Sequence, residues 1–242
     1  MSSHLETLPE TLPLEAPSEP ANNRLRWFEL VLVLVVCFGT SIIGSLDIAI
    51  TGRSPSVQTT ESRWVNSFVH EAVGLLLMGY VLARRKVGLR SLGLRWSLRD
   101  LGVGLGVFLV GSFVYGAGRS FLVLAVPGFY SSQHTGQIAH QLFGHPSLAA
   151  LPFFVINPFF EELVVRAYLM TELKALTGSW ILSTAVSVLV QSSYHLYYGV
   201  GGAVVLSFLF MTFSIYYARA RKATPIIFAH GIFDLFALIR IR

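Results

Sequence analysis

The sequence predicts an all-α membrane protein, a polytopic bundle of about seven transmembrane helices. Three observations lead to this prediction. First, 53% of the 242 residues are hydrophobic and 13% are charged, whereas soluble domains carry about 25% charged residues. Second, long apolar runs recur along the chain, while the strands of a membrane barrel would alternate in short segments. Third, the basic residues gather beside these runs, as membrane topology signals do.

A single transmembrane domain, residues 24–242, is expected to follow an N-terminal tail. Residues 1–23 are rich in Pro, Glu, Ser and Thr without a hydrophobic period, which predicts a disordered segment. Arg24 and Arg26 stand beside the first apolar run and no small-residue cleavage site follows, so we do not expect a signal peptide. The one cysteine, Cys37, excludes a disulfide within the chain and any cysteine-based metal cluster.

Seven apolar runs come near the length of about 20 residues that an α-helix needs to cross a bilayer. We expect these spans at residues 28–46, 65–83, 101–126, 148–171, 179–197, 200–218 and 224–240. The last three are short and have polar interruptions. The third span is rich in glycine, which lets helices approach closely. The glycines concerned are at positions 102, 104, 106, 111, 116 and 118.

The lysines and arginines predict how the bundle is oriented. With the N-terminus inside, twelve of the 18 fall in cytoplasmic segments, four fall outside and two lie within spans. Cytoplasmic loops are enriched in these residues, so we expect a cytoplasmic N-terminus and an external C-terminus. Together with the lack of an expected cleaved signal, this orientation suggests a plasma or inner membrane if the source is prokaryotic. Topology explains the basic residues, and nucleic acid is therefore not an expected partner.

Three polar stretches lie between or near the ends of these spans. Residues 87–100 combine Gly, Leu and basic residues with Trp96, which predicts a helix lying in the cytoplasmic interface. The loop 127–147 holds three histidines at spacings that do not share a helix face, and it is expected to be a polar outer loop rather than a metal site. His70 and Glu71, near the outer end of the second span, are expected to be solvated at the interface rather than to line a cavity.

An unusual charged cluster stands inside the fourth span. Glu161, Glu162 and Arg166 interrupt an apolar run, and a charge at mid-helix costs about 2.5–3.5 kcal/mol on the insertion scale. Such groups must face a polar interior and find partners. Glu162 and Arg166 are i and i+4, which predicts an ion pair. Glu161 is offset by about 100° and should face other helices. The alternative is a purely structural charge network between helices.

Two later histidines stand in apolar surroundings, each with a polar residue four positions away. His195 follows Gln191, and His230 precedes Asp234. Simple spans place His195 near the outer end of its helix, but we expect both histidines to converge with Glu161 in one cavity. Their chemistry is hydrolytic: a buried carboxylate can take a proton from water, and His or Asp can stabilise an oxyanion.

A metal offers a second route to the same chemistry. Glu161, His195 and His230 could hold a divalent ion such as zinc, which would make a bound water acidic. The HExxH spacing of zinc proteases is absent from the sequence, as is the Gly-x-Ser-x-Gly of serine hydrolases. The cofactor therefore stays open between none and one divalent metal.

These motifs resemble those of the CPBP family, the CAAX proteases and bacteriocin-processing enzymes. The resemblance covers residues 148–234 and rests on Glu161-Glu162-x-x-x-Arg166, His195 and His230-x-x-x-Asp234. It implies that Glu161 activates water and that Glu162 and Arg166 form a supporting pair. It also implies that His195, His230 and Asp234 complete the catalytic site. Two positions depart from the family pattern: Gln191 stands where Phe is usual, and Asp234 stands where Asn is commoner.

The resemblance implies an intramembrane endopeptidase. Its substrate would be a hydrophobic or lipid-modified C-terminal peptide, such as a prenylated one, or a membrane-anchored leader. A different class stays open: a non-catalytic scaffold or immunity protein of the same fold, in which the charges stabilise helix packing. A transporter using Glu and His as a proton relay is a weaker third interpretation, because the sequence shows no inverted repeat of broken helices.

Overall fold

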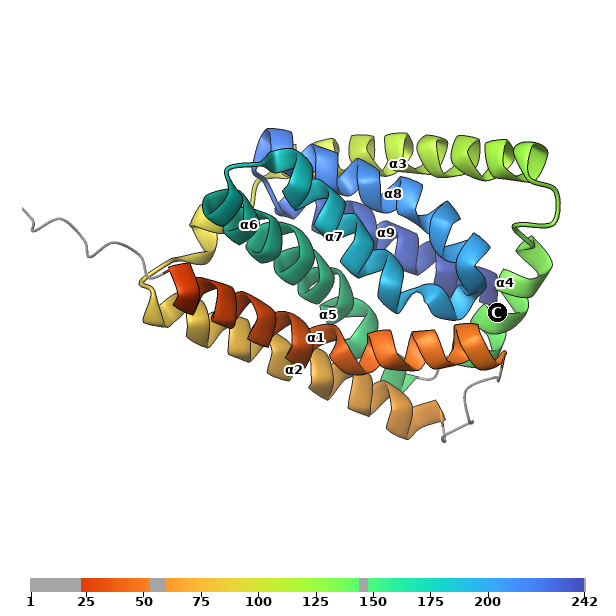
Figure 1. Ribbon diagram of the computed structural model, residues 1–242, viewed down its shortest axis with the longest axis horizontal. Helices are drawn as coiled ribbons and strands as arrows, with labels where there is room; N and C mark the ends of the chain where they lie inside the picture. The colour runs from red at the N-terminus through yellow and green to blue at the C-terminus, as the bar shows by residue number, and fades with distance from the viewer. Residues whose placement is uncertain (1–22, 53–59, 144–147, 242) are drawn as a thin grey trace, which may run out of the picture.

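The computed structural model describes residues 23–52, 60–143 and 148–241, and every regular element within these ranges is helical (Figure 1). Seven helical rods coincide with the seven predicted spans. They are α1 (Asn23–Thr51), α2 (Thr60–Arg84), α3 (Leu98–Ala125), a rod of α5 (Leu151–Glu161), η3 (Glu162–Tyr168) and α6 (Leu169–Thr177), then α7 (Trp180–Tyr194), α8 (Gly199–Ala220) and α9 (Thr224–Ile241). Of the predicted tail, residues 1–23, residues 1–22 lie outside the described residues, and Asn23 is the first residue of α1.

The prediction of a helical membrane bundle is confirmed, and the count of seven spans is approximate. Five of the described rods are long and apolar enough to cross a membrane. They are Asn23–Thr51, Glu61–Arg84, Leu98–Ala125, Leu148–Thr177 and Leu196–Ala220. Two further helices are shorter, because α7 has 15 residues and the apolar part of α9 is Thr224–Ile239.

The rod that carries the two adjacent glutamates runs through the middle of the bundle. Helices α1 and α2 lie on one side of it, α7, α8 and α9 lie on the other, and α3 is outermost (Figure 1). Every residue from 160 to 170 is buried. The charges of this segment therefore face protein and not lipid, as intramembrane ionisable residues generally do.

Close packing of α3 explains half of its glycines. Gly104, Gly111 and Gly118, seven residues apart, are buried against α8 and α9. A Cβ at Gly118 would lie 2.4 Å from the Phe208 ring, and one at Gly104 would lie 2.7 Å from the Pro225 carbonyl oxygen. The other three glycines of the predicted set, at 102, 106 and 116, have nothing within 4 Å of such a Cβ.

The stretch before α3 differs from the prediction of an interfacial helix. Its helical part is one 3-10 turn, η1 (Leu89–Leu92), and the prediction of a helix over residues 87–100 is therefore wrong in extent. The turn ends because Gly93 adopts φ +84°, a conformation that favours glycine. The Gly93 carbonyl then accepts a hydrogen bond from Ala223 N at 3.0 Å, which ties the segment to the start of α9.

The predicted polar outer loop 127–147 contains a short helix that was not predicted from the sequence, α4 (Ser132–Phe143). The Ser131 Oγ accepts a hydrogen bond from His134 N at 3.2 Å, which satisfies one of the free amides of the first turn. His134 and His140 are exposed on this helix. The third histidine, His145, lies outside the described residues.

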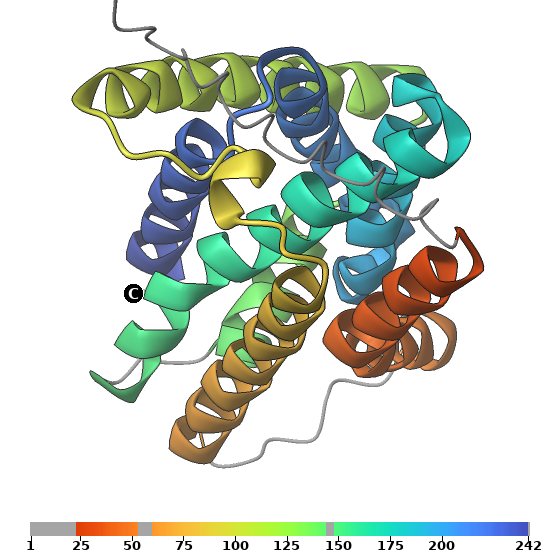
Figure 2. The ribbon, with the colours of Figure 1, turned by 90° about the vertical axis from the view of Figure 1, so that its left-hand side faces the viewer.

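Ion pairs join α1, α2 and α6 at one end of the bundle, the end that faces the viewer in Figure 2. Glu172 contacts Arg26 at 3.0 Å and Arg85 at 2.7 Å. Glu29 contacts both Arg84 and Arg85. We call these five residues the basic-end network. The ion pairs therefore join α6 to the consecutive helices α1 and α2 at this end.

Candidate active site

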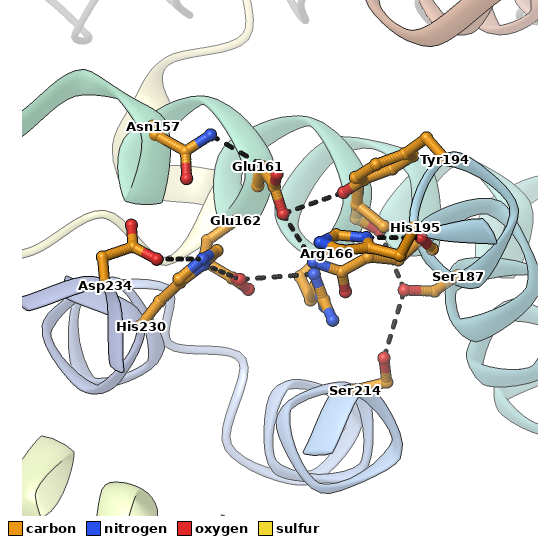
Figure 3. A network of polar contacts seen from close by, with 12 residues as sticks. Asn157, Glu161, Glu162, Arg166, Ser187, Tyr194, His195, Ser214, His230 and Asp234 are labelled. Atoms are coloured by element: carbon orange, nitrogen blue, oxygen red, sulfur yellow. Dashed lines mark hydrogen bonds and ion pairs between the residues drawn. The ribbon is translucent and has the colours of Figure 1, made fainter. Parts of the chain in front are cut away.

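Glu161, the last residue of α5, is 7% exposed and receives hydrogen bonds from two helices. Its Oε2 accepts a hydrogen bond from Gln191 Nε2 at 2.6 Å. It accepts a second one from Tyr194 Oη at 2.9 Å (Figure 3), and both donors are on α7. Its Oε1 accepts a longer hydrogen bond, 3.4 Å, from Asn157 Nδ2. The prediction that Glu161 faces groups supplied by another helix is confirmed.

Glu162 is held by different partners, and the predicted pair with Arg166 is confirmed. Arg166 Nη1 lies 3.3 Å from Glu162 Oε1, and both side chains are fully buried. The guanidinium carbon also lies 5.7 Å from the ring centroid of Phe210 and 5.9 Å from that of Phe213. Cation–π contacts with the two rings thus add to the attraction between the Glu162 carboxylate and the desolvated guanidinium of Arg166.

Backbone geometry separates the two adjacent carboxylates. Glu161 ends α5, whereas Glu162 begins η3, a π-helical segment in which each amide bonds five residues back. The segment starts four residues after Pro158, which has no amide hydrogen to donate to an α-helical ladder. Glu161 consequently contacts α7 while Glu162 contacts α9. Short π-helical segments occur frequently at functional sites.

His230 on α9 links Glu162 to Asp234. Its Nδ1 lies 2.7 Å from Glu162 Oε1, and its Nε2 lies 3.5 Å from Asp234 Oδ1. Figure 3 shows the resulting chain of polar contacts, which ends at Arg166. Both ring nitrogens of His230 thus face carboxylates, and the ring is held from two sides.

His195 follows the last residue of α7 and is oriented by its own helix. Its Nδ1 lies 2.9 Å from the Gln191 carbonyl oxygen. A carbonyl can only accept, so Nδ1 carries the hydrogen, and Nε2 of the neutral ring is an acceptor. His195 therefore contacts the backbone carbonyl of Gln191, the residue four positions before it, and not the Gln191 side chain. The Gln191 side chain instead reaches Glu161.

A cavity of about 550 Å³ brings the catalytic candidates together. Glu161, His195 and Asp234 all line it, as expected from the sequence. Of the two histidines expected to border this cavity with Glu161, His195 lines it and His230 does not; His230 instead contacts Asp234 on the cavity wall. Water-sized molecules therefore have room next to the Glu161 carboxylate, which is the geometric requirement for general-base chemistry.

Sequence reasoning missed several polar residues around Glu161. Glu71 is 5% exposed and its Oε1 accepts from Asn157 Nδ2 at 2.8 Å, so one amide bridges two carboxylates. His70 Nε2 lies 2.8 Å from the Cys37 carbonyl oxygen, and both His70 and Glu71 line the cavity. The prediction that this pair is solvated at the interface is wrong, because α2 packs against α5 and turns it inward.

Two local spacings in the sequence could have pointed to polar residues near Glu161. Asn157 stands four residues before Glu161, and Tyr194 stands directly before His195. The first spacing predicts a shared helix face. Which of them meets the carboxylate depends on how deeply α7 sits against α5, and a sequence pattern within one helix carries no information about that depth.

The three proposed metal ligands are not arranged around a common point. Across the residues that the structure describes, no three His, Cys, Asp or Glu side chains are placed to hold a metal ion. His230 is engaged by two carboxylates, and Glu161 accepts hydrogen bonds from amide and phenol donors. This geometry fits a hydrogen-bonded carboxylate better than a metal ligand.

One comparison with known proteins gives a match that includes the candidate site. Residues 143–236 match the family model described as type II CAAX prenyl endopeptidase, Rce1-like. The match includes every candidate residue from Glu161 to Asp234. The resemblance to the CPBP family is confirmed. None of the curated proteins and none of the solved structures matches the chain significantly. The family supports protease activity of the CAAX type in a membrane-embedded protein.

The two departures from the CPBP pattern have visible consequences. A Phe at position 191 could not donate a hydrogen bond, whereas Gln191 donates to Glu161 from a fully buried position. Asp234 gives His230 a second carboxylate neighbour where Asn would offer an uncharged amide. Both changes add polar contacts to the site.

Proposed function

We propose that this protein is an intramembrane endopeptidase in which Glu161 activates a water molecule. The observation that supports this proposal most strongly is the position of the buried Glu161 carboxylate. Donors on α7 hold it at the border of a cavity with room for water and peptide. Glu161 takes a proton as the water oxygen bonds to the peptide carbonyl carbon. The proton then passes to the leaving nitrogen, and the C–N bond breaks.

The neighbouring side chains are proposed to position water and stabilise charge. His195, with Nδ1 bound to a backbone carbonyl, has Nε2 available to orient the water. Asp234 on the cavity wall and His230 behind it form the opposite side of the site. Donors preorganised around a developing oxyanion are the usual source of rate enhancement in acyl transfer. Glu162 and Arg166 support His230 from within the protein core.

The substrate class follows from the family and the fold. We propose a peptide bond in a membrane-associated protein or peptide, hydrophobic or lipid-modified. A glutamate-activated water is favoured over a metal-bound one, because the candidate ligands are held by other partners. The charge distribution supports a plasma-membrane orientation with a cytoplasmic N-terminus.

Cleavage by purified protein in detergent tests this proposal. Glu161→Gln keeps the shape of the side chain but removes its ability to take a proton. Its kcat for a fluorogenic hydrophobic peptide should fall by about 10²–10⁴, the usual contribution of general-base catalysis. Glu61→Gln, an exposed carboxylate in the first turn of α2, is the matched control and should cleave like wild type.

Chelator is added to wild type in parallel. Cleavage that survives the chelator but is lost in Glu161→Gln supports the glutamate-activated water. Full activity of Glu161→Gln would refute the proposed role of Glu161. Loss of wild-type cleavage with chelator would instead assign the chemistry to a metal.

A further inference from the structure

We infer that the catalytic cavity receives its substrate from the extracytoplasmic side of the membrane. The inference rests on the proposed protease function and narrows its substrate class. The substrate would be an exported peptide or leader, or the external segment of a membrane protein. A lipid-modified C-terminus on the cytoplasmic side would face the basic end of the bundle, away from the cavity.

The first observation is that the basic residues gather at one end of the helices. This end holds the start of α1, the end of α2, η1, the start of α3, the end of α6, and the junction of α8 with α9. Twelve of the 18 Lys and Arg residues lie there: Arg24, Arg26, Arg84, Arg85, Lys86, Arg90, Arg95, Arg99, Lys174, Arg219, Arg221 and Lys222. Short connections enriched in Lys and Arg remain in the cytoplasm, whatever acidic residues accompany them.

The opposite end is poor in basic residues. Within the described side chains it carries Arg63, early in α2, and Arg119, late in α3. Arg166 is buried in the core and belongs to neither end. The rule that orients membrane proteins therefore places this end outside the cytoplasm.

The second observation is that the cavity lies in the half of the bundle with few basic residues. Its walls come from residues 37–48 in the second half of α1, 63–71 early in α2, 194–198 at and directly after the end of α7, and 234–237 late in α9. Residues 153–161 of α5 supply the remaining wall. The basic-end network lies at the other ends of α1 and α2.

The third observation is a polar entrance between α1 and α2. Thr40, Ser41 and Ser45 of α1 line the cavity together with Asn66 and Ser67 of α2, although both helices are otherwise largely apolar. Three of the five, Thr40, Ser41 and Asn66, are exposed. Asn66 is about 9 Å along the helix from the start of α2, at 1.5 Å per residue. Water thus has a path to the site from this end.

Cysteine labelling in intact cells tests the orientation without relying on activity. The native Cys37 is fully buried but lines the cavity, so each variant is made in a Cys37→Ala background. Glu61→Cys reports the end with few basic residues, Asn66→Cys reports the entrance, and Arg90→Cys on η1 reports the basic end; all three positions are exposed. A membrane-impermeant maleimide should label the first two in intact cells, and Arg90→Cys only after permeabilisation.

The opposite pattern, with Arg90→Cys labelled in intact cells and Glu61→Cys protected, would overturn the inference. It would also be overturned if Glu61→Cys reacts while Asn66→Cys stays unlabelled after permeabilisation, because the entrance would then be closed to water. Each variant is checked for an unchanged melting profile in detergent, so that a misfolded chain is not scored.

Cleavage in membrane vesicles separates this inference from the protease proposal. A water-soluble fluorogenic peptide should be cut by right-side-out vesicles, and cleavage should be lost in sealed inverted vesicles. Cleavage confined to inverted vesicles would overturn the inference and leave the protease proposal standing. The predicted labelling without cleavage in either preparation or in detergent would overturn the protease proposal and leave the orientation standing.

Discussion

At the scale of single residues, the structure gives two adjacent glutamates different surroundings. Glu162 is enclosed by Arg166 and His230 in the protein core. Glu161 meets the uncharged donors Gln191 and Tyr194 and borders the cavity. Only a carboxylate that borders the cavity can contact the attacking water. Geometry alone therefore assigns the general-base role to Glu161 and a supporting role to Glu162.

Asn157 gives a residue-scale prediction, because its amide donates to both Glu71 and Glu161. Asn157→Ala should free one oxygen of Glu161 and lower kcat by about 10²-fold, the cost of a small misplacement of a reacting group. KM should change little. Asn66→Ala is the control, since Asn66 also lines the cavity and makes no side-chain hydrogen bond with the described residues. Steady-state kinetics of both variants measure the effect, and equal kcat values for the two would contradict the positioning role.

Single-residue contacts were predictable where both partners share a helix. The pairs Glu162 with Arg166 and His230 with Asp234 follow from i,i+4 spacing and are present. The contact of Gln191 with Glu161 joins two helices and depends on their relative depth. That depth is set by packing along the whole length of the helices, which no local spacing encodes.

At the scale of elements, apolar runs located the helices, whereas only three of the six glycines predicted to pack in α3 do so. The seven predicted spans are all present as helical rods. Helix α4 was missed because it is polar and short, and the stretch of η1 was overestimated because Gly93 ends it. The π-helical segment η3 had no sequence signature, since its wider turn is a response to Pro158 and to partners on α7 and α9.

The glycine face of α3 provides the element-scale prediction. Gly104→Ala would bring a methyl group within 2.7 Å of the Pro225 carbonyl and should destabilise the protein by about 1–3 kcal/mol. Gly106→Ala on the same helix has nothing within 4 Å, and should leave stability unchanged or raise it by up to about 1 kcal/mol through helix propensity. Thermal unfolding in detergent compares the two. Equal melting temperatures would show that α3 can shift to accept the methyl group.

At the scale of the whole molecule, the ion pairs that join helices lie at one end of the bundle, and the candidate active site lies toward the other end. The basic-end network joins α1, α2 and α6 through Glu29 and Glu172. At the other end, the same α1 and α2 form the polar entrance to the cavity. Two helices that are joined firmly at one end can leave room between them at the other, and this arrangement allows water into the site while the bundle stays intact.

This separation predicts that Glu172→Gln affects stability and not catalysis. The change leaves Arg26 and Arg85 without the carboxylate that both contact, and it should lower the free energy of unfolding by about 1–3 kcal/mol. The kcat and KM of the folded enzyme should match wild type, because the cavity lies at the opposite end of α1 and α2.

Arg219→Gln, an exposed position at the basic end, is the control and should alter stability by at most about 0.5 kcal/mol. Melting in detergent and cleavage below the melting temperature measure the two quantities on one preparation. A fall in kcat without a fall in stability would mean that the basic end is coupled to the site through α1 and α2, and the two ends would then have to be treated as one unit.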